Sequence, residues 1–284
     1  GIRRNLFRVI WFTGKTGRDK SPYRQHLPPI LDNGILTAMN DPWVILGQPL
    51  SGGILVVCDH ASNHVPQEID LGIDAKLLSQ HIAYDIGVTG VATFLVELSG
   101  CAAFLATNSR LVVDLNRYPN DASAIPVASD GVEIPGNHLD ASGREARLDR
   151  YFHPYHARLE DLLRHHRPSL VLSVHSFTPR LESDPHGHRP WEIGVLYNEY
   201  EIAANLAIDR LEGEGLVVGD QLPYSGKLLN ATMNRHAEAN EIPYIGVEIR
   251  QDLVGSSEGQ ERFAAILGEM AQYVAERLAS DGAN

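Results

Sequence analysis

The sequence predicts an α/β domain whose mixed, mostly parallel β-sheet is flanked by helices. Short runs of β-branched and other apolar residues recur along the chain, polar loops follow several of them, and segments with helical periodicity separate them. Alternation of strands and helices places helices on both faces of a sheet, and strands covered on both faces consist of nearly continuous apolar runs. The chain has 284 residues, 43% of them hydrophobic, which is enough to bury such a core.

The N-terminal part of the chain differs from the rest. Residues 1–50 are basic at first and then interrupted by prolines, so we expect them to form an irregular extension. Residues 51–284 show the alternation of strands and helices without an internal repeat or a convincing linker. We therefore predict a single domain over residues 51–284.

The elements follow from the apolar pattern in chain order. The first predicted strand is Ile54–Cys58, a β-branched run after Gly-Gly. The other predicted strands are 101–106, 111–113, 169–174, 193–197, 216–218 and 244–249. The predicted helices are 77–98, 143–166, 199–213 and 260–279. Within 143–166 we expect Pro154 to start a new helix or to kink the existing one.

Charge and hydropathy exclude several classes of partner. The chain has 24 Lys and Arg against 36 Asp and Glu, a net charge of −12, and no basic stripe, so we expect no nucleic-acid partner. No apolar run approaches the ~20 residues of a membrane span, so we expect no membrane partner. The N-terminal apolar stretch is shorter than the ~7–15 residues of a signal-peptide core, so we expect a cytoplasmic location.

Several catalytic chemistries have no motif in this chain. It contains neither a Walker-type phosphate loop nor a GxGxxG sequence, and no GxSxG elbow for a serine nucleophile. Cys58 and Cys101 lie in apolar runs, without the electropositive setting of a reactive thiolate. This elimination favours a metal-activated water over covalent catalysis.

Polar residues stand at the carboxyl ends of three predicted strands. They are His60 after Asp59, then His175, and Glu248 near the end of the last strand. Ligands of open α/β sheets bind at this edge. Two imidazoles and a carboxylate there can form a divalent metal site with its base, in which the metal lowers the pKa of water and polarises a carbonyl.

The third metal ligand has two candidates in the loop after the first strand. Asn63 stands three residues after His60 and offers a carboxamide oxygen, although the same residue type also forms Asx turns. Asp59 is the competing ligand, or instead orients an imidazole from behind. Both alternatives stay open.

Candidate substrate-binding residues lie in three further segments. Arg117 follows a short predicted strand, and its planar guanidinium is suited to gripping a carboxylate, the alternative being a salt bridge to Asp114. Two later segments carry donors for an anionic substrate: Tyr224 with Ser225, and Arg235 with His236. His236 is also a candidate acid for proton transfer.

Eight segments together resemble the N-formylglutamate amidohydrolase family, most closely its branch of predicted amidohydrolases. In chain order they are DHASNHVP, DLNRYP, RYFHPYH, VHSFTP, RPWEIGVLYN, PYSG, RHAE and GVEIRQDL. They fall within roughly residues 53–275, most of the chain. The resemblance implies a fold similar to that of the zinc carboxypeptidases, the phosphorylase/hydrolase-like fold, with a metal at the strand ends.

The resemblance also implies roles for individual residues. His60 and His175 match the metal-binding positions of the family, and Glu248 resembles the carboxylate that activates water. Asn116 and Arg117 resemble the pair that engages substrate in carboxypeptidase-like enzymes.

We therefore expect a metal-dependent hydrolase, with zinc as the expected metal, that cleaves a linear amide in an N-acyl amino acid. The lead substrate is N-formyl-L-glutamate, which would give formate and glutamate. Arg117, helped by Arg235 or Arg250, would bind the substrate carboxylates. The alternatives are a carboxypeptidase-like hydrolase of another N-acyl amino acid or peptide-like amide, and a non-catalytic small-molecule binder on the same scaffold.

Overall fold

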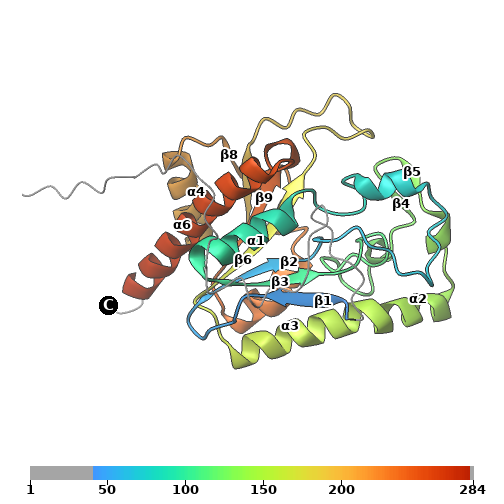
Figure 1. Cartoon of the computed structure of the whole chain (residues 1–284), viewed down its shortest axis with the longest axis horizontal. Helices are drawn as coiled ribbons and strands as arrows, with labels where there is room; N and C mark the ends of the chain where they lie inside the picture. The colour runs from blue at the N-terminus through green and yellow to red at the C-terminus, as the bar shows by residue number, and fades with distance from the viewer. Residues whose placement is uncertain (1–40, 282–284) are drawn as a thin grey trace, which may run out of the picture.

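The structure, a computed structural model, describes residues 41–281 and consists of a seven-stranded sheet between two layers of helices (Figure 1). The strand order is β1-β3-β2-β6-β9-β7-β8. These strands are β1 (Trp43–Leu46), β2 (Ile54–Cys58), β3 (Ala102–Ala106), β6 (Leu170–Phe177), β7 (Ile193–Leu196), β8 (Val218–Asp220) and β9 (Tyr244–Arg250). A separate hairpin is formed by β4 (Ala128–Ser129) and β5 (Val132–Glu133).

The centre of the sheet is parallel and its edges are mixed. Strands β3, β2, β6 and β9 run parallel to one another, whereas β1 is antiparallel to β3 and β7 is antiparallel to β9. The predicted fold class, a mixed and mostly parallel sheet flanked by helices, is confirmed. The parallel order brings the carboxyl ends of β2, β6 and β9 to one edge.

The side chains of each central strand alternate between two cores. On β2, Val56 and Cys58 face the first core, and Leu55 and Val57 face the second. Helices α1, α4 and α6 cover the first core, and α3 and α5 cover the second (Figure 1). The helices are α1 (Val88–Ser99), α2 (Ala141–Arg147), α3 (His153–His165), α4 (Glu201–Gly213), α5 (Ala231–His236) and α6 (Ser257–Asp281). No helix within residues 41–281 has both the length and the apolar character needed to cross a membrane.

Three sequence predictions need correction. The expected irregular extension does not hold at Trp43–Leu46, because this segment forms edge strand β1, paired with β3; residues 1–40 lie outside the described part of the chain. Residues 111–113 form no strand, because Ser109 and Arg147 bind their backbone groups in a buried turn. In the predicted helix 77–98 only the second half is α-helical. Gly87 precedes α1 with a φ of +86°, and a Cβ there would collide with the carbonyl oxygen of Val254.

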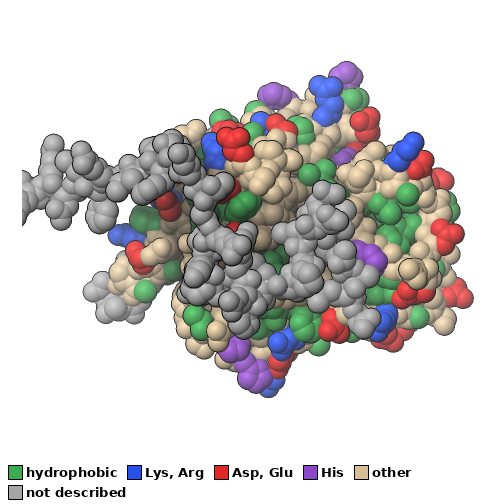
Figure 2. All heavy atoms as spheres, viewed as in Figure 1, with side chains coloured by type: hydrophobic (Ala, Val, Ile, Leu, Met, Phe, Trp, Pro, Cys, Tyr) green, Lys and Arg blue, Asp and Glu red, His purple; other side chains and the backbone are tan. Residues whose placement is uncertain are grey.

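Two boundaries also matter for the site. Strand β6 extends to Phe177, so His175 lies within the strand and not after it. Helices α2 and α3 are joined by a π-helical turn at Leu148–Phe152. Pro154 stands in the first turn of α3, the part of a helix that tolerates proline best. Figure 2 shows acidic and basic side chains interspersed on one face of the described chain.

Candidate metal centre and active site

Two histidines meet at the carboxyl edge of the central strands. His60 is the second residue after β2, and His175 lies on the neighbouring β6. Their ring centroids are 5.1 Å apart, and both side chains are buried. Glu248 on β9 is the register partner of His175, so it lies beside this pair.

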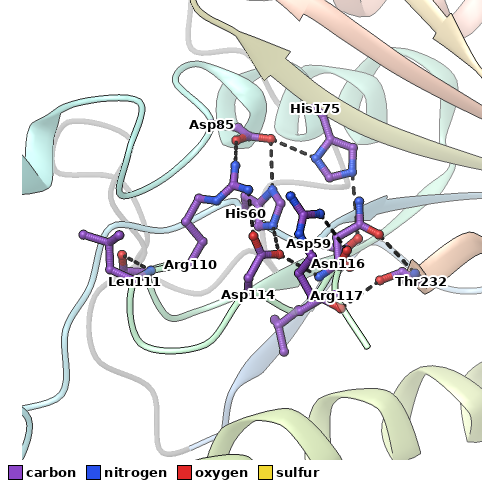
Figure 3. A network of polar contacts seen from close by, with 12 residues as sticks. Asp59, His60, Asp85, Arg110, Leu111, Asp114, Asn116, Arg117, His175 and Thr232 are labelled. Atoms are coloured by element: carbon purple, nitrogen blue, oxygen red, sulfur yellow. Dashed lines mark hydrogen bonds and ion pairs between the residues drawn. The ribbon is translucent and has the colours of Figure 1, made fainter. Parts of the chain in front are cut away.

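Asp85 lies between the two imidazoles (Figure 3). Its Oδ2 is 2.8 Å from Nδ1 of His175 and 3.4 Å from Nδ1 of His60. One ligand atom from each of these three side chains lies within 4.8 Å of the other two. Asp85 comes from the turn before α1, so three separate segments deliver the three groups.

Each imidazole is held from behind through its Nε2. His60 Nε2 donates to Oδ1 of Asp114 at 2.8 Å. His175 Nε2 lies 3.2 Å from Oγ of Ser173 and 3.8 Å from Oδ2 of Asp59. With a metal bound, a proton on Nε2 would leave the Nδ1 lone pair of each ring free to coordinate the metal on the side of Asp85, the arrangement in which groups behind the ring orient metal-binding histidines.

The side chains present fit a divalent cation. Two imidazole nitrogens and a carboxylate oxygen are the donor types and the number that catalytic zinc takes from a protein. In addition, Glu248 Oε2 and Asp59 Oδ2 are buried oxygens without a hydrogen-bond partner in the described part of the chain. Unpaired buried polar atoms are costly, so the unpaired Glu248 oxygen beside the histidines fits a bound group at this place. Asp59 lies on the opposite, Nε2 side of His175.

Arg110 balances part of the negative charge. Its Nη2 donates to Oδ2 of Asp114 at 2.7 Å, and its Nη1 lies 3.4 Å from Oδ1 of Asp85. The guanidinium therefore bridges the candidate ligand Asp85 and the carboxylate that orients His60 (Figure 3).

Comparison with known proteins shows the family to which this chain belongs. The sequence profile of the N-formylglutamate amidohydrolase family matches residues 52–254. The chain belongs to this family. The resemblance found in the motifs is thus confirmed, and membership identifies the chain as a hydrolase of the amidohydrolase type. A comparison with curated proteins gave no match.

Two solved structures are similar to this chain. A gene product of Agrobacterium tumefaciens is 31% identical, with a TM-score of 0.78, over 84% of this chain and 96% of that one. The N-formylglutamate amidohydrolase of Ralstonia eutropha is 19% identical, with a TM-score of 0.62, over 84% of this chain and 99% of that one. The second likeness concerns the fold alone.

Burial and neighbouring charges move the pKa values of Glu248 and Asp85 in opposite directions. Burial, together with the Asp85 carboxylate, raises the pKa of Glu248 to about 7. Burial also opposes the charge on Asp85, but His60 and His175 outweigh it and lower the pKa of Asp85. Burial opposes the charged form of His175 as well, yet the hydrogen bond to Asp85 raises its pKa to about 9. A carboxyl with a pKa near neutrality is suited to proton transfer.

A cavity of about 140 Å³ opens beside these groups. Its lining includes His60, Asp85, Arg110, Asn116, Arg117, His175, Tyr224 and Glu248. Arg117 donates to the carbonyl oxygen of Asn116 at 3.0 Å, and no described carboxylate forms an ion pair with it. The alternative salt bridge to Asp114 is not formed, because His60 and Arg110 occupy that carboxylate. Arg117 can therefore receive an anion in the cavity.

Five predicted site residues lie outside the lining of this cavity. Asn63 donates its Nδ2 to the carbonyl oxygen of Leu78 at 2.9 Å, which ties the first loop to the chain before Asp85. The other four are His236 (buried against His156), Arg235 (exposed), Arg250 (paired with Asp252) and Ser225 (bonded to the backbone N–H of Lys227).

Sequence reasoning missed Asp85 and Arg110 and considered Asp114 only as a partner of Arg117. Asp85 stands in the segment predicted as one long helix, so it gave no strand-end signal. The one signal in the sequence is that Asp85 is an acidic residue in an otherwise apolar stretch, two positions before Gly87.

Proposed function

We propose that this family member is a metal-dependent hydrolase of the linear amide bond in N-acyl amino acids, with zinc as the metal. N-formyl-L-glutamate is the lead substrate, with formate and glutamate as products. The observation that carries the proposal is the convergence of His60, His175 and Asp85 next to the buried carboxyl of Glu248. We also propose a cytoplasmic location and a small-molecule substrate as the partner.

Three side chains would hold the metal: His60 and His175 through Nδ1, and Asp85 through its carboxylate. Asp85 thus replaces Asn63 and Asp59 as the proposed third ligand, since Asn63 bonds to Leu78 and Asp59 lies behind His175. When bound, a divalent metal supplies Lewis acidity, which lowers the pKa of water and polarises the amide carbonyl.

Glu248 is the proposed general base and acid. Its carboxylate accepts a proton from the attacking water as the new carbon–oxygen bond forms. The same proton then passes to the amide nitrogen as the carbon–nitrogen bond breaks, which releases the amino group of the product. A pKa of about 7 lets Glu248 accept and return the proton at neutral pH.

Arg117 is the proposed carboxylate-binding residue. It lines the cavity without a carboxylate partner among the described residues, and the neighbouring Asn116 and Tyr224 line the same cavity. A guanidinium that binds the substrate carboxylate orients the acyl group toward Glu248.

The test combines metal analysis with formate release. We expect the purified chain to contain about one divalent metal ion per molecule. It should release formate from N-formyl-L-glutamate, lose this activity in the presence of a chelator and regain it with zinc. Deformylation that a chelator leaves unchanged would contradict the metal part of the proposal. A parallel panel of N-acetyl amino acids and short peptides separates the alternative substrates.

A further inference from the structure

His156 is a buried imidazole that does not belong to the cavity lining. It lies on α3, and its side chain is 1% exposed. The ring is packed against Phe152, with centroids 4.2 Å apart, and stands edge-on to Tyr155 at 5.3 Å. These contacts leave it little freedom to rotate, so its two nitrogens point at defined partners.

The partners determine where His156 carries its proton. Nε2 lies 3.1 Å from the carbonyl oxygen of Leu115, which can only accept, so Nε2 is the donor. Nδ1 of the neutral ring is then an acceptor, and Nε2 of His236 donates to it at 2.8 Å. Burial lowers the pKa of both histidines, that of His236 to about 4, so both rings are neutral at pH 7.

Leu115 directly precedes the cavity-lining residues Asn116 and Arg117. Its carbonyl oxygen accepts a second hydrogen bond from Oγ1 of Thr232 at 3.1 Å, and the backbone N–H of Thr232 donates to Oδ1 of Asn116 at 3.0 Å. Thr232 and His236 are one turn apart on α5. Helices α3 and α5, which cover the second core, therefore both hydrogen-bond to the segment that carries Arg117.

We infer that His156 is a positioning residue: its hydrogen bond to Leu115, with the ring held in one tautomer by His236, sets where Arg117 stands in the cavity. This gives His236, a candidate acid from the sequence, a supporting role behind the segment. The inference rests on the proposed function in one respect only, that Arg117 binds the substrate carboxylate.

Two substitutions separate positioning from simple packing. His156→Leu removes the donor to Leu115, whereas His156→Gln keeps an amide N–H near the position of Nε2. His165→Leu is the matched control, because His165 lies on the same helix, is exposed and bonds only within its own helix. Steady-state kinetics with N-formyl-L-glutamate and amide hydrogen exchange at residues 115–118 are measured for all three zinc-loaded variants and the unaltered protein.

We expect His156→Leu to raise KM by about tenfold to a hundredfold while kcat changes by less than about threefold, since misplaced binding groups weaken substrate binding. Exchange at residues 115–118 should accelerate by about tenfold or more as the segment opens locally. His156→Gln should restore most of both properties, and His165→Leu should change neither.

The outcomes also separate this inference from the proposed function. Unchanged KM and unchanged exchange in His156→Leu would overturn the positioning role while leaving the hydrolase intact. If the unaltered protein hydrolyses no N-acyl amino acid, the proposed function fails, and accelerated exchange still supports the positioning role. Should His156→Leu not fold, ¹⁵N-histidine spectra of the unaltered protein decide, because a proton on Nδ1 of His156 would overturn the inference.

Discussion

Asp85 and Glu248 are buried carboxyl groups at the same edge of the sheet, yet their surroundings move their pKa values in opposite directions. Burial opposes the charge on Asp85, but the imidazoles of His60 and His175 favour that charge and lower the pKa of Asp85. Glu248 has an oxygen without a partner, and burial raises its pKa to about 7. Environments that separate two carboxyl groups in this way assign a fixed charge to one and proton transfer to the other.

Replacing Glu248 tests its role directly. We expect Glu248→Gln to lower kcat by about 10²–10⁴-fold, the usual contribution of a general base, while the metal content stays unchanged. Glu261→Gln, an exposed position on α6, is the matched control. Formate release and elemental analysis of both variants provide the check. Full turnover by Glu248→Gln would remove this residue from the base role.

The third ligand can be identified by comparing two variants. Asp85→Asn should weaken zinc binding by more than the roughly 10–100-fold typical of an orienting residue, because a charged ligand is lost. Asn63→Ala should keep the metal and cost about 1 kcal/mol of stability, since it removes only the bond to Leu78. Competitive zinc titration measures both. Metal loss in Asn63→Ala with retention in Asp85→Asn would reverse the assignment.

At the scale of elements, periodicity identified the strands that the core covers on both faces. Strands β2 and β3 are continuous apolar runs, β6 and β9 begin with apolar runs and end in polar residues, and each lies within three residues of its predicted bounds. Edge strand β1 was not predicted, because only alternate residues of it are buried and prolines flank it. Residues 111–113 were wrongly predicted as a strand because they are apolar and buried. They lie in a turn, in which the Arg147 side chain hydrogen-bonds to the carbonyl oxygen of Val112 in place of a neighbouring strand.

The contact between α3 and α5 predicts a dependence of stability on pH. Burial lowers the pKa values of His156 and His236 in the folded protein, and Arg235 adds to this effect. In the unfolded chain both histidines have the ordinary pKa of about 6.5, so below that pH the unfolded chain binds more protons than the folded one. The contribution of these two histidines to stability is therefore complete above about pH 6.5 and is lost as the pH drops toward 4. For His236, a lowering from 6.5 to about 4 corresponds to roughly 3 kcal/mol at the acidic end.

Denaturant unfolding between pH 7 and pH 4 checks this expectation. His236→Gln retains a donor for His156 but cannot be protonated, so its stability should fall less steeply than that of the unaltered protein. His165→Gln, at an exposed position of α3, should follow the unaltered protein. If the free energy of unfolding fell with pH to the same extent in all three proteins, the prediction would be contradicted.

At the scale of the whole molecule, the proposed metal would join segments that are far apart in the sequence. His60 follows β2, Asp85 precedes α1, and His175 lies on β6. A ligand that binds only the folded chain stabilises it by mass action, by about 4 kcal/mol at a thousandfold excess over its Kd. For a domain of this size we expect zinc to raise the Tm of the chelator-treated protein by roughly 10 °C.

Thermal unfolding with and without zinc measures this shift. The Asp85→Asn variant should gain little from the same zinc concentration, whereas Asn63→Ala should gain as much as the unaltered protein. An equal rise in Tm for Asp85→Asn would indicate that zinc binds elsewhere.

The sequence by itself determined the alternation of buried strands and helices, the family, and the residue types that stand at the carboxyl edge of the sheet. Those properties depend on local hydrophobic pattern and on motifs, which are readable along the chain. Only the tertiary structure decided that Asp85 lies between the histidines, that Arg110 rather than Arg117 pairs with Asp114, and that His236 lies behind the cavity. These facts depend on strand register and on the paths of loops, which bring together residues that no local pattern relates.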